Sequence, residues 1–222
     1  MALAYTGEKY EDEVYNFGVE AGAKDHWQSH KFNLGLPFPN LPYYIDGNVC
    51  LTQSSAVLKH IGRKHGLCGK CPADEAQVDM LLDTVADCFS SMGKVVFNPD
   101  CVRLKLSREV FATATKIASY LLQENLIPKH CEEMEPKLKQ FSDFLGTKKF
   151  LVGDCITVAD FPLFDVLKIH NHMNSKLICK FPNLVVYMQR LEEDPKIKAF
   201  LCSDKNFKDF FPPMAAFKYT TK

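Results

Sequence analysis

The 222-residue chain has no net charge, because 27 lysine and arginine residues balance 27 aspartate and glutamate residues. Nucleic acids and anionic membranes attract proteins with an excess of positive charge, so we expect neither as a partner. The sequence also lacks an apolar run of the roughly 20 residues that a membrane-spanning helix needs. Its first residues have neither the basic start nor the apolar core of a signal peptide. We therefore expect a cytoplasmic protein that binds a small molecule.

The sequence gives little support to a disulfide framework or a metal centre. Nine cysteines lie at irregular spacings without a secretory signal, so reduced thiols are expected. Cys68 and Cys71 have the C-x-x-C spacing of dithiol oxidoreductases, and His60 and His65 would complete a zinc ligand set. A redox dithiol normally follows the first strand at the start of a helix, whereas this pair follows a predicted helix. We therefore interpret the spacing as accidental and predict no metal.

The first third of the chain has an α/β pattern. The segment Asp-Gly-Asn at 46–48 predicts a hairpin turn, because these residues tolerate positive φ. Ser54 is expected to cap the helix that follows the hairpin. In order, we predict a strand at 11–17, paired strands at 41–46 and 49–52, and a helix from Ser54 to near Gly66.

Beyond residues 68–74 the pattern is helical almost throughout, and 46% of all residues are apolar, which is ample for a buried core. Thr157 and Asp160 resemble a capping box with aspartate in place of glutamate. They should open a buried helix through Phe161 and Phe164. The other predicted helices span 73–97, 103–127, 132–145, 182–191 and 195–201.

Five motifs, in order along the chain, resemble those of cytosolic glutathione transferases of the mu class. They are F-N-L-G-L-P-F-P-N-L-P-Y at 32–43, Q-S-S at 53–55, R-K-H-G-L-C-G at 63–69, F-L-V-G-D-C-I-T-V-A-D-F at 150–161 and F-P-N-L at 181–184. The resemblance implies an α/β plus all-α fold, with a thioredoxin-like domain over 1–70 and a helical-bundle domain over 71–222. It also implies a homodimer that conjugates glutathione, its co-substrate, to hydrophobic electrophiles in detoxification, without a cofactor.

The same resemblance implies how the two ends of glutathione would be bound. Trp27 and Lys31 would bind the glycine carboxylate through an indole N–H and an ammonium group, with Lys24 assisting at longer range. Gln53 and Ser54 would bind the γ-glutamyl end at a helix amino terminus.

Other residues are implied in the middle of the site and across the dimer. Asn40 would sit at the loop turn, and Leu41, before a cis Pro42, would offer its backbone N–H and C=O to the cysteinyl unit. Three further positions follow the family pattern: Asp87 of the partner subunit would face the glutathione amino group, Phe38 would enter a pocket of the other subunit, and Phe97 would line the acceptor-substrate site.

The chain departs from this family at its start. The family's catalytic tyrosine lies in a Y-W-D-I-R-G-like motif after the first strand, and no such motif occurs here. Met1–Thr6 match the last turns of the first helix, where Tyr5 has a structural position. We therefore expect an incomplete thioredoxin-like domain with unpaired strand edges and impaired turnover. The alternative is a non-catalytic protein that binds glutathione or a hydrophobic ligand.

A second departure is the segment 106–127, about 22 residues longer than the pattern allows. Its residues Val110, Ala114, Ile117 and Leu121 fall on one helical stripe, which predicts an extra helix packed on the helical domain. The alternative is an artefact of the gene model, such as retained non-coding sequence. Phe97 is a smaller departure, since the class often has a tyrosine there.

Overall fold

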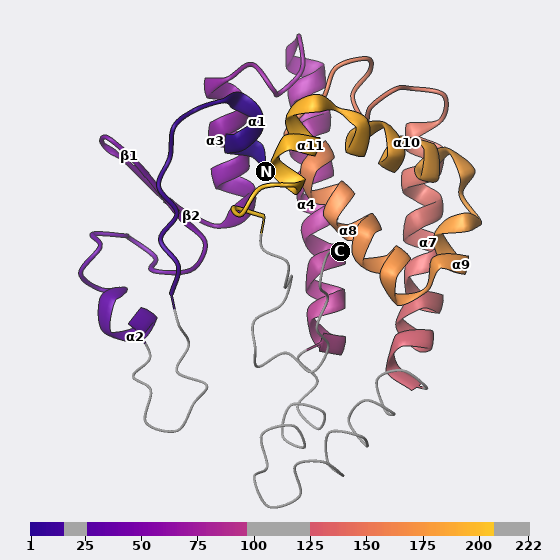
Figure 1. Ribbon diagram of the computed structural model, residues 1–222, viewed down its shortest axis with the longest axis horizontal. Helices are drawn as coiled ribbons and strands as arrows, with labels where there is room; N and C mark the ends of the chain where they lie inside the picture. The colour runs from indigo at the N-terminus through magenta and orange to yellow at the C-terminus, as the bar shows by residue number, and fades with distance from the viewer. Residues whose placement is uncertain (16–25, 97–124, 207–222) are drawn as a thin grey trace, which may run out of the picture.

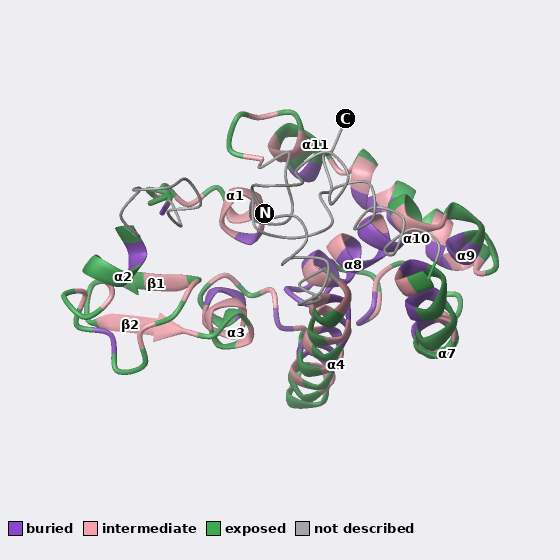
Figure 2. Ribbon diagram, turned by 90° about the horizontal axis from the view of Figure 1, so that it is seen from below, coloured by how far each residue is buried: buried purple, intermediate pink, exposed green. Residues whose placement is uncertain are grey.

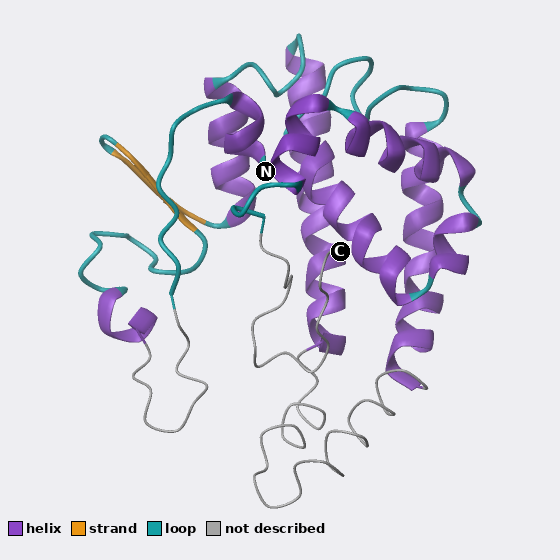
Figure 3. Cartoon of the chain, in the orientation of Figure 1, coloured by secondary structure: helices purple, strands orange, loops and turns teal. Residues whose placement is uncertain are grey.

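The computed structural model describes residues 1–15, 26–96 and 125–206 (Figure 1). In chain order the elements are α1 (Ala2–Thr6), α2 (His26–His30), β1 (Tyr43–Asp46), β2 (Val49–Thr52), α3 (Ser54–Lys64), α4 (Pro72–Val96), α7 (Ile127–Leu145), α8 (Asp160–Met173), α9 (Ser175–Cys179), α10 (Pro182–Glu193) and α11 (Pro195–Leu201). The hairpin of β1 and β2 lies at one side of the molecule, and α1 and α3 lie between it and the long helices (Figures 1 and 3). None of the described helices is long and apolar enough to cross a membrane.

The predicted hairpin is confirmed. β1 pairs antiparallel with β2, with Tyr43 opposite Thr52 and Asp46 opposite Val49. Gly47 adopts φ 56° in the turn, a conformation that costs glycine little. The predicted strand at 11–17 is wrong over its first five residues, which form no strand, while residues 16 and 17 lie outside the described ranges. Glu and Asp disfavour a strand there, and Tyr15 instead packs on Trp27.

A small ionic network joins three separate segments of the α/β part. The Lys64 ammonium, near the end of α3, contacts the carboxylates of Glu8 and of Asp46, the latter at 2.6 Å. His65 Nε2 lies 2.6 Å from Glu8 Oε2. These contacts lower the pKa of Glu8, chiefly through the hydrogen bond from Lys64. The network fixes the end of the hairpin and the segment after α1 against α3.

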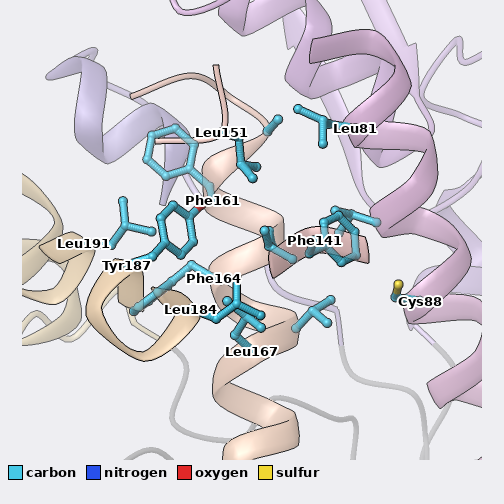
Figure 4. Close-up of a cluster of buried hydrophobic side chains, with 14 of the residues drawn as sticks. Leu81, Cys88, Phe141, Leu151, Phe161, Phe164, Leu167, Leu184, Tyr187 and Leu191 are labelled. Carbon is cyan, nitrogen blue, oxygen red and sulfur yellow. The ribbon is translucent and has the colours of Figure 1, made fainter. Parts of the chain in front are cut away.

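The long helices form one apolar core around α8, which packs on α4, α9 and α10 (Figure 2). Apolar side chains of α8 meet those of α4, α7 and α10 in Figure 4, and the labelled members are Leu81, Cys88, Phe141, Leu151, Phe161, Phe164, Leu167, Leu184, Tyr187 and Leu191. The expectation that α8 is buried through Phe161 and Phe164 is thus confirmed.

Helix ends differ from the prediction in informative ways. A helix was expected to stop before Pro128, but α7 begins at Ile127 with Pro128 in its first turn, where a proline loses no hydrogen bond. The predicted helix at 103–127 and the extra segment at 106–127 fall on residues that the structure does not describe, apart from residues 125–127. The short helices α2 and α9 were not predicted.

Asp160 is completely buried and holds the start of α8 in place. Its Oδ1 accepts hydrogen bonds from the Leu151 N–H at 3.0 Å and the Tyr187 hydroxyl at 2.8 Å. Its Oδ2 accepts from the Thr157 N–H at 2.7 Å and the Thr157 hydroxyl at 2.9 Å. The predicted capping box is therefore half correct: the carboxylate reaches back to the Thr157 amide, but the threonine hydroxyl donates to Asp160 and caps no amide.

Two buried histidines form a second polar contact inside the helical core. His130 of α7 and His170 of α8 are 2% and 0% exposed, and their Nε2 atoms lie 3.0 Å apart. His170 Nδ1 lies 2.7 Å from the Val166 carbonyl oxygen and must donate to it, so its Nε2 accepts from His130. His130 Nδ1 then carries a lone pair without a partner among the described residues. Both imidazoles are therefore held in the neutral form.

Gly62 allows α3 to pack closely on Cys68 and Val158, two residues of the loops after α3 and before α8, and this gives a stability prediction. A Cβ atom there would lie 2.5 Å from Cys68 Sγ and 2.8 Å from Val158 Cγ2. Gly62→Ala should therefore lower the free energy of unfolding by about 1–3 kcal/mol, measured by urea denaturation. Gly93→Ala in α4 is the matched control, because its Cβ would meet nothing within 4 Å. It should raise stability by about 0.5–1 kcal/mol, and equal effects of the two variants would contradict the prediction.

Candidate functional site

The first residue of the candidate site is Trp27, the second residue of α2. Its side chain is only 6% exposed. The indole stacks on the Tyr43 ring, with centroids 6.2 Å apart and planes 12° apart, and meets the Tyr15 ring edge-on at 5.2 Å. Leu34, Leu36, Leu41 and Cys50 also belong to this cluster, which is separate from the helical core. The cluster fixes α2 against the start of β1.

Lys31 directly follows α2, and its N–H donates to the Trp27 carbonyl oxygen at 2.9 Å. Its ammonium lies 4.9 Å from the centroid of the Phe32 ring. Within the described ranges, no carboxylate lies within ion-pair distance of this ammonium. Lys31 is thus a cation beside Trp27 that has no anionic partner there.

The loop between α2 and β1 ends in the cis peptide bond Leu41–Pro42, as the resemblance implied. The exposed Asn40 turns back on the chain, and its Oδ1 accepts a hydrogen bond from the Leu41 N–H at 2.9 Å. Leu41 therefore has its N–H engaged by its neighbour in the structure. No motif predicted this hydrogen bond, which a ligand that pairs with the Leu41 N–H would have to replace.

Gln53 has the most unusual backbone of the site, with φ 71° and ψ 112°. It is the one non-glycine residue with positive φ in the described part of the chain. Such strained residues concentrate at ligand sites, because the surrounding structure must hold them in place.

Gln53, rather than the predicted Ser54, is the N-cap of α3, and its side chain caps no amide. Ser54 is instead the first helical residue and is exposed. The prediction failed because the helix starts one residue earlier than expected, directly after the strained Gln53. The first amides of this 11-residue helix are left uncapped by any side chain, and with the helix dipole they favour an anion.

The hairpin register brings these parts together. Because Tyr43 pairs with Thr52, the Leu41–Pro42 bond before β1 and the Gln53–Ser54 pair after β2 lie at the same end of the hairpin. Trp27 reaches this end through its stack on Tyr43. The Trp27 indole, the Leu41–Pro42 bond and the amino terminus of α3 thus lie at one end of the hairpin, and Lys31 directly follows the helix that carries Trp27.

Several predicted site residues do not meet at this place. Asp87 is exposed on α4, and Phe38 is 78% exposed on the loop before β1. Their predicted roles involve a second subunit and remain predictions. Lys24 and Phe97 lie outside the described residues.

A polar network formed by Glu13, Tyr15 and Tyr43 next to Trp27 was not predicted from the sequence. The Tyr43 hydroxyl donates to Glu13 Oε2 at 2.7 Å and lies 2.9 Å from the Tyr15 hydroxyl. Burial and these hydrogen bonds raise the pKa of Tyr43. The sequence signal in this segment was the group Val14, Tyr15 and Phe17, which favours a strand and led to the strand prediction at 11–17. The network holds in place the two tyrosine rings on which Trp27 packs.

The cysteine pair at 68 and 71 lacks the surroundings of a reactive dithiol. Cys68 is buried and its pKa is raised by burial, whereas a redox nucleophile needs a lowered pKa. Cys71 is exposed. Across residues 1–15, 26–96 and 125–206, no group of three or more histidine, cysteine or acidic side chains could hold a metal ion.

Comparisons with known proteins assign the chain to a family. The family described as "Glutathione S-transferase, N-terminal domain" matches residues 1–63, and "Glutathione S-transferase, C-terminal domain" matches residues 111–204. The crystal structure of the glutathione S-transferase Blo t 8 superposes with a TM-score of 0.76 at 25% identity, over 98% of this chain and 92% of that one. The chain belongs to the glutathione S-transferase family, with a thioredoxin-like N-terminal domain, a small antiparallel sheet and a helical C-terminal domain.

Within the family the chain is similar to mu-class proteins over most of its length. It is 36% identical to human glutathione S-transferase Mu 1 across 206 residues, which are 92% of this chain and 84% of the relative. It is 35% identical to rat glutathione S-transferase Mu 2 across 97% of this chain and 89% of the relative. The class-mu 26 kDa isozyme of Schistosoma japonicum is 35% identical across 92% of this chain and 82% of the relative. The resemblance inferred from the five motifs is thus confirmed.

Proposed function

We propose that this chain is a mu-class glutathione transferase that joins the glutathione thiol to small hydrophobic electrophiles. The observation that carries the proposal is the strained Gln53 at the uncapped start of α3, at the same hairpin end as Leu41 and Trp27, in a chain of this family. Glutathione acts as co-substrate, and no cofactor takes part. The protein works in the cytoplasm as a homodimer, divided near residue 70 into the two family domains.

Each end of glutathione has a matching group in this arrangement. The Lys31 ammonium and the indole N–H of Trp27, four residues earlier in the chain, fit the glycine carboxylate as a cation and a neutral donor, and the backbone N–H of Lys31 joins the two residues by donating to the Trp27 carbonyl oxygen. The uncapped amides of Gln53, Ser54 and the next residues fit the γ-glutamyl carboxylate. Asp87 of a second subunit, exposed on α4, supplies the negative charge for the amino group. Phe38 packs into that second subunit.

The binding site is tested by Gln53→Ala. Removing the side-chain carboxamide of Gln53 should weaken glutathione binding by roughly 10-fold to 100-fold, the value of one or two hydrogen bonds to charged groups. The measurement is isothermal titration calorimetry on the purified chain. Gln77→Ala, on α4 away from the hairpin, is the matched control and should bind like the parent chain. Unchanged affinity in Gln53→Ala would remove the side chain of Gln53 from the site, and a parent chain that does not bind glutathione would refute the proposed function.

Turnover is measured separately from binding. At saturating glutathione the chain should conjugate 1-chloro-2,4-dinitrobenzene faster than the uncatalysed reaction. The same assay measures how fast the turnover is. A chain that binds glutathione without raising the rate would be the non-catalytic binding protein considered above.

A further inference from the structure

We propose that His26 and His30 form a surface clamp for one divalent transition-metal ion, Ni²⁺, Cu²⁺ or Zn²⁺, at α2. The two histidines are the first and last residues of this helix, in the spacing i, i+4. Residues four apart lie on the same face of a helix. Both side chains are exposed, so an ion reaches them without the cost of burial.

The distance between the rings suits a shared ion. Their centroids are 4.7 Å apart, and their planes meet at 75°. A metal ion binds an imidazole nitrogen at about 2.0–2.1 Å, so two imidazoles on one ion have centroids about 4.5–5.2 Å apart for ligand angles between about 90° and 109°. The observed separation lies in this range. Imidazole is also the ligand that these three ions accept well in proteins.

The surroundings favour a positive ion. Glu13 lies close enough to both imidazoles to interact with them electrostatically, so its carboxylate provides a negative field at the clamp. The Tyr15 ring lies 5.2 Å from the His26 ring and 6.4 Å from the His30 ring, and it forms the base of the clamp. Because no third side chain in the described part of the chain joins the group, water would occupy the remaining coordination positions.

The clamp would join the two ends of a five-residue helix that is too short to be stable alone. Trp27 lies between the two ligands in this helix and is part of the Tyr15 and Tyr43 cluster. The ion would therefore hold α2 on that cluster. The clamp needs only the two imidazoles, so it does not depend on glutathione binding.

The experiment uses the fluorescence of Trp27, the single tryptophan of the chain. Ni²⁺ quenches a nearby indole, so titration of the glutathione-free protein with Ni²⁺ should give saturable quenching that EDTA reverses. His30→Gln and His26→Gln should each weaken the apparent affinity by roughly tenfold or more, since each removes one of two ligands. The matched control is His172→Gln, which removes an exposed histidine at the end of α8. It should titrate like the parent chain.

The outcomes separate clearly. Equal quenching of the parent chain and both α2 variants would overturn the clamp, as would quenching that rises linearly without saturation. Both α2 substitutions are on the surface, and far-UV circular dichroism checks that each variant keeps its fold. Since no glutathione is present, failure of the clamp leaves the proposed function untouched, and failure of glutathione binding leaves the clamp untouched.

Discussion

Replacing Asp160 by alanine is expected to lower the free energy of unfolding by about 3–5 kcal/mol, enough to remove much of the stability of an ordinary domain. The carboxylate is fully buried and accepts four hydrogen bonds, from Leu151, from Tyr187 and twice from Thr157. Alanine would leave the Leu151 and Thr157 donors buried without partners and the Tyr187 hydroxyl with only the backbone carbonyl of residue 160 at 3.4 Å, and each unpaired group costs about 1–3 kcal/mol when it finds no water. Urea denaturation followed by circular dichroism measures the loss.

Two further variants sharpen this prediction. Asp160→Asn keeps one acceptor oxygen and should lose less stability than the alanine variant. Asp143→Ala removes an exposed carboxylate that pairs with Lys139 in α7, so it should change stability by less than about 0.5 kcal/mol. If Asp160→Ala were as mild as Asp143→Ala, the four hydrogen bonds would not hold the start of α8.

Acid should destabilise the helical core through the buried histidine pair. Burial, and then the charge of His170, lowers the pKa of His130 to about 4, and burial also lowers the pKa of His170. An unfolded histidine has a pKa near 6.5, so below this pH the unfolded chain binds protons that the folded chain refuses. The stabilisation is therefore complete at neutral pH and is lost as the pH falls from about 6.5 towards 4. The loss from His130 alone is about 2–3 kcal/mol.

His130→Gln isolates this contribution. The glutamine amide can still donate to His170 Nε2, but it does not titrate in this range. Urea denaturation at pH 7 and at pH 4 should show a stability loss about 2–3 kcal/mol smaller in the variant than in the parent chain. His172→Gln, on the surface of α8, should keep the parent's pH dependence. Identical pH dependence in His130→Gln and the parent would mean that the pair does not sense acid.

Local signals predicted the local parts of this molecule. Asp46, Gly47 and Asn48 form a turn for reasons of backbone geometry alone, so the hairpin could be located from three residues. Pro128 was misread because a proline is common both after one helix and in the first turn of the next. The five-residue α2 is too short to show a helical period, and it depends on packing by Trp27.

Contacts between distant residues could not be predicted in this way. His130 and His170 are 40 positions apart, and only the packing of α7 on α8 brings them together. The capping box suggested that Asp160 bonds Thr157, but nothing pointed to Leu151 or Tyr187. The candidate residues of the site were named from family motifs, whereas the positive φ of Gln53 and the Asn40 to Leu41 hydrogen bond follow from the folded backbone.

The hydrogen bond between Asn40 and Leu41 has a consequence for what the site can discriminate. Since the Leu41 N–H is already satisfied before a peptide arrives, a ligand backbone that takes its place exchanges one hydrogen bond for another, with a net gain below the usual 0.5–1.5 kcal/mol or so. In the proposed site, the binding free energy would then come mainly from the two charged ends of the ligand, near Lys31 and near Gln53. We expect such a site to select a peptide by its length, because a ligand one residue shorter or longer would reach only one of the two proposed anchors.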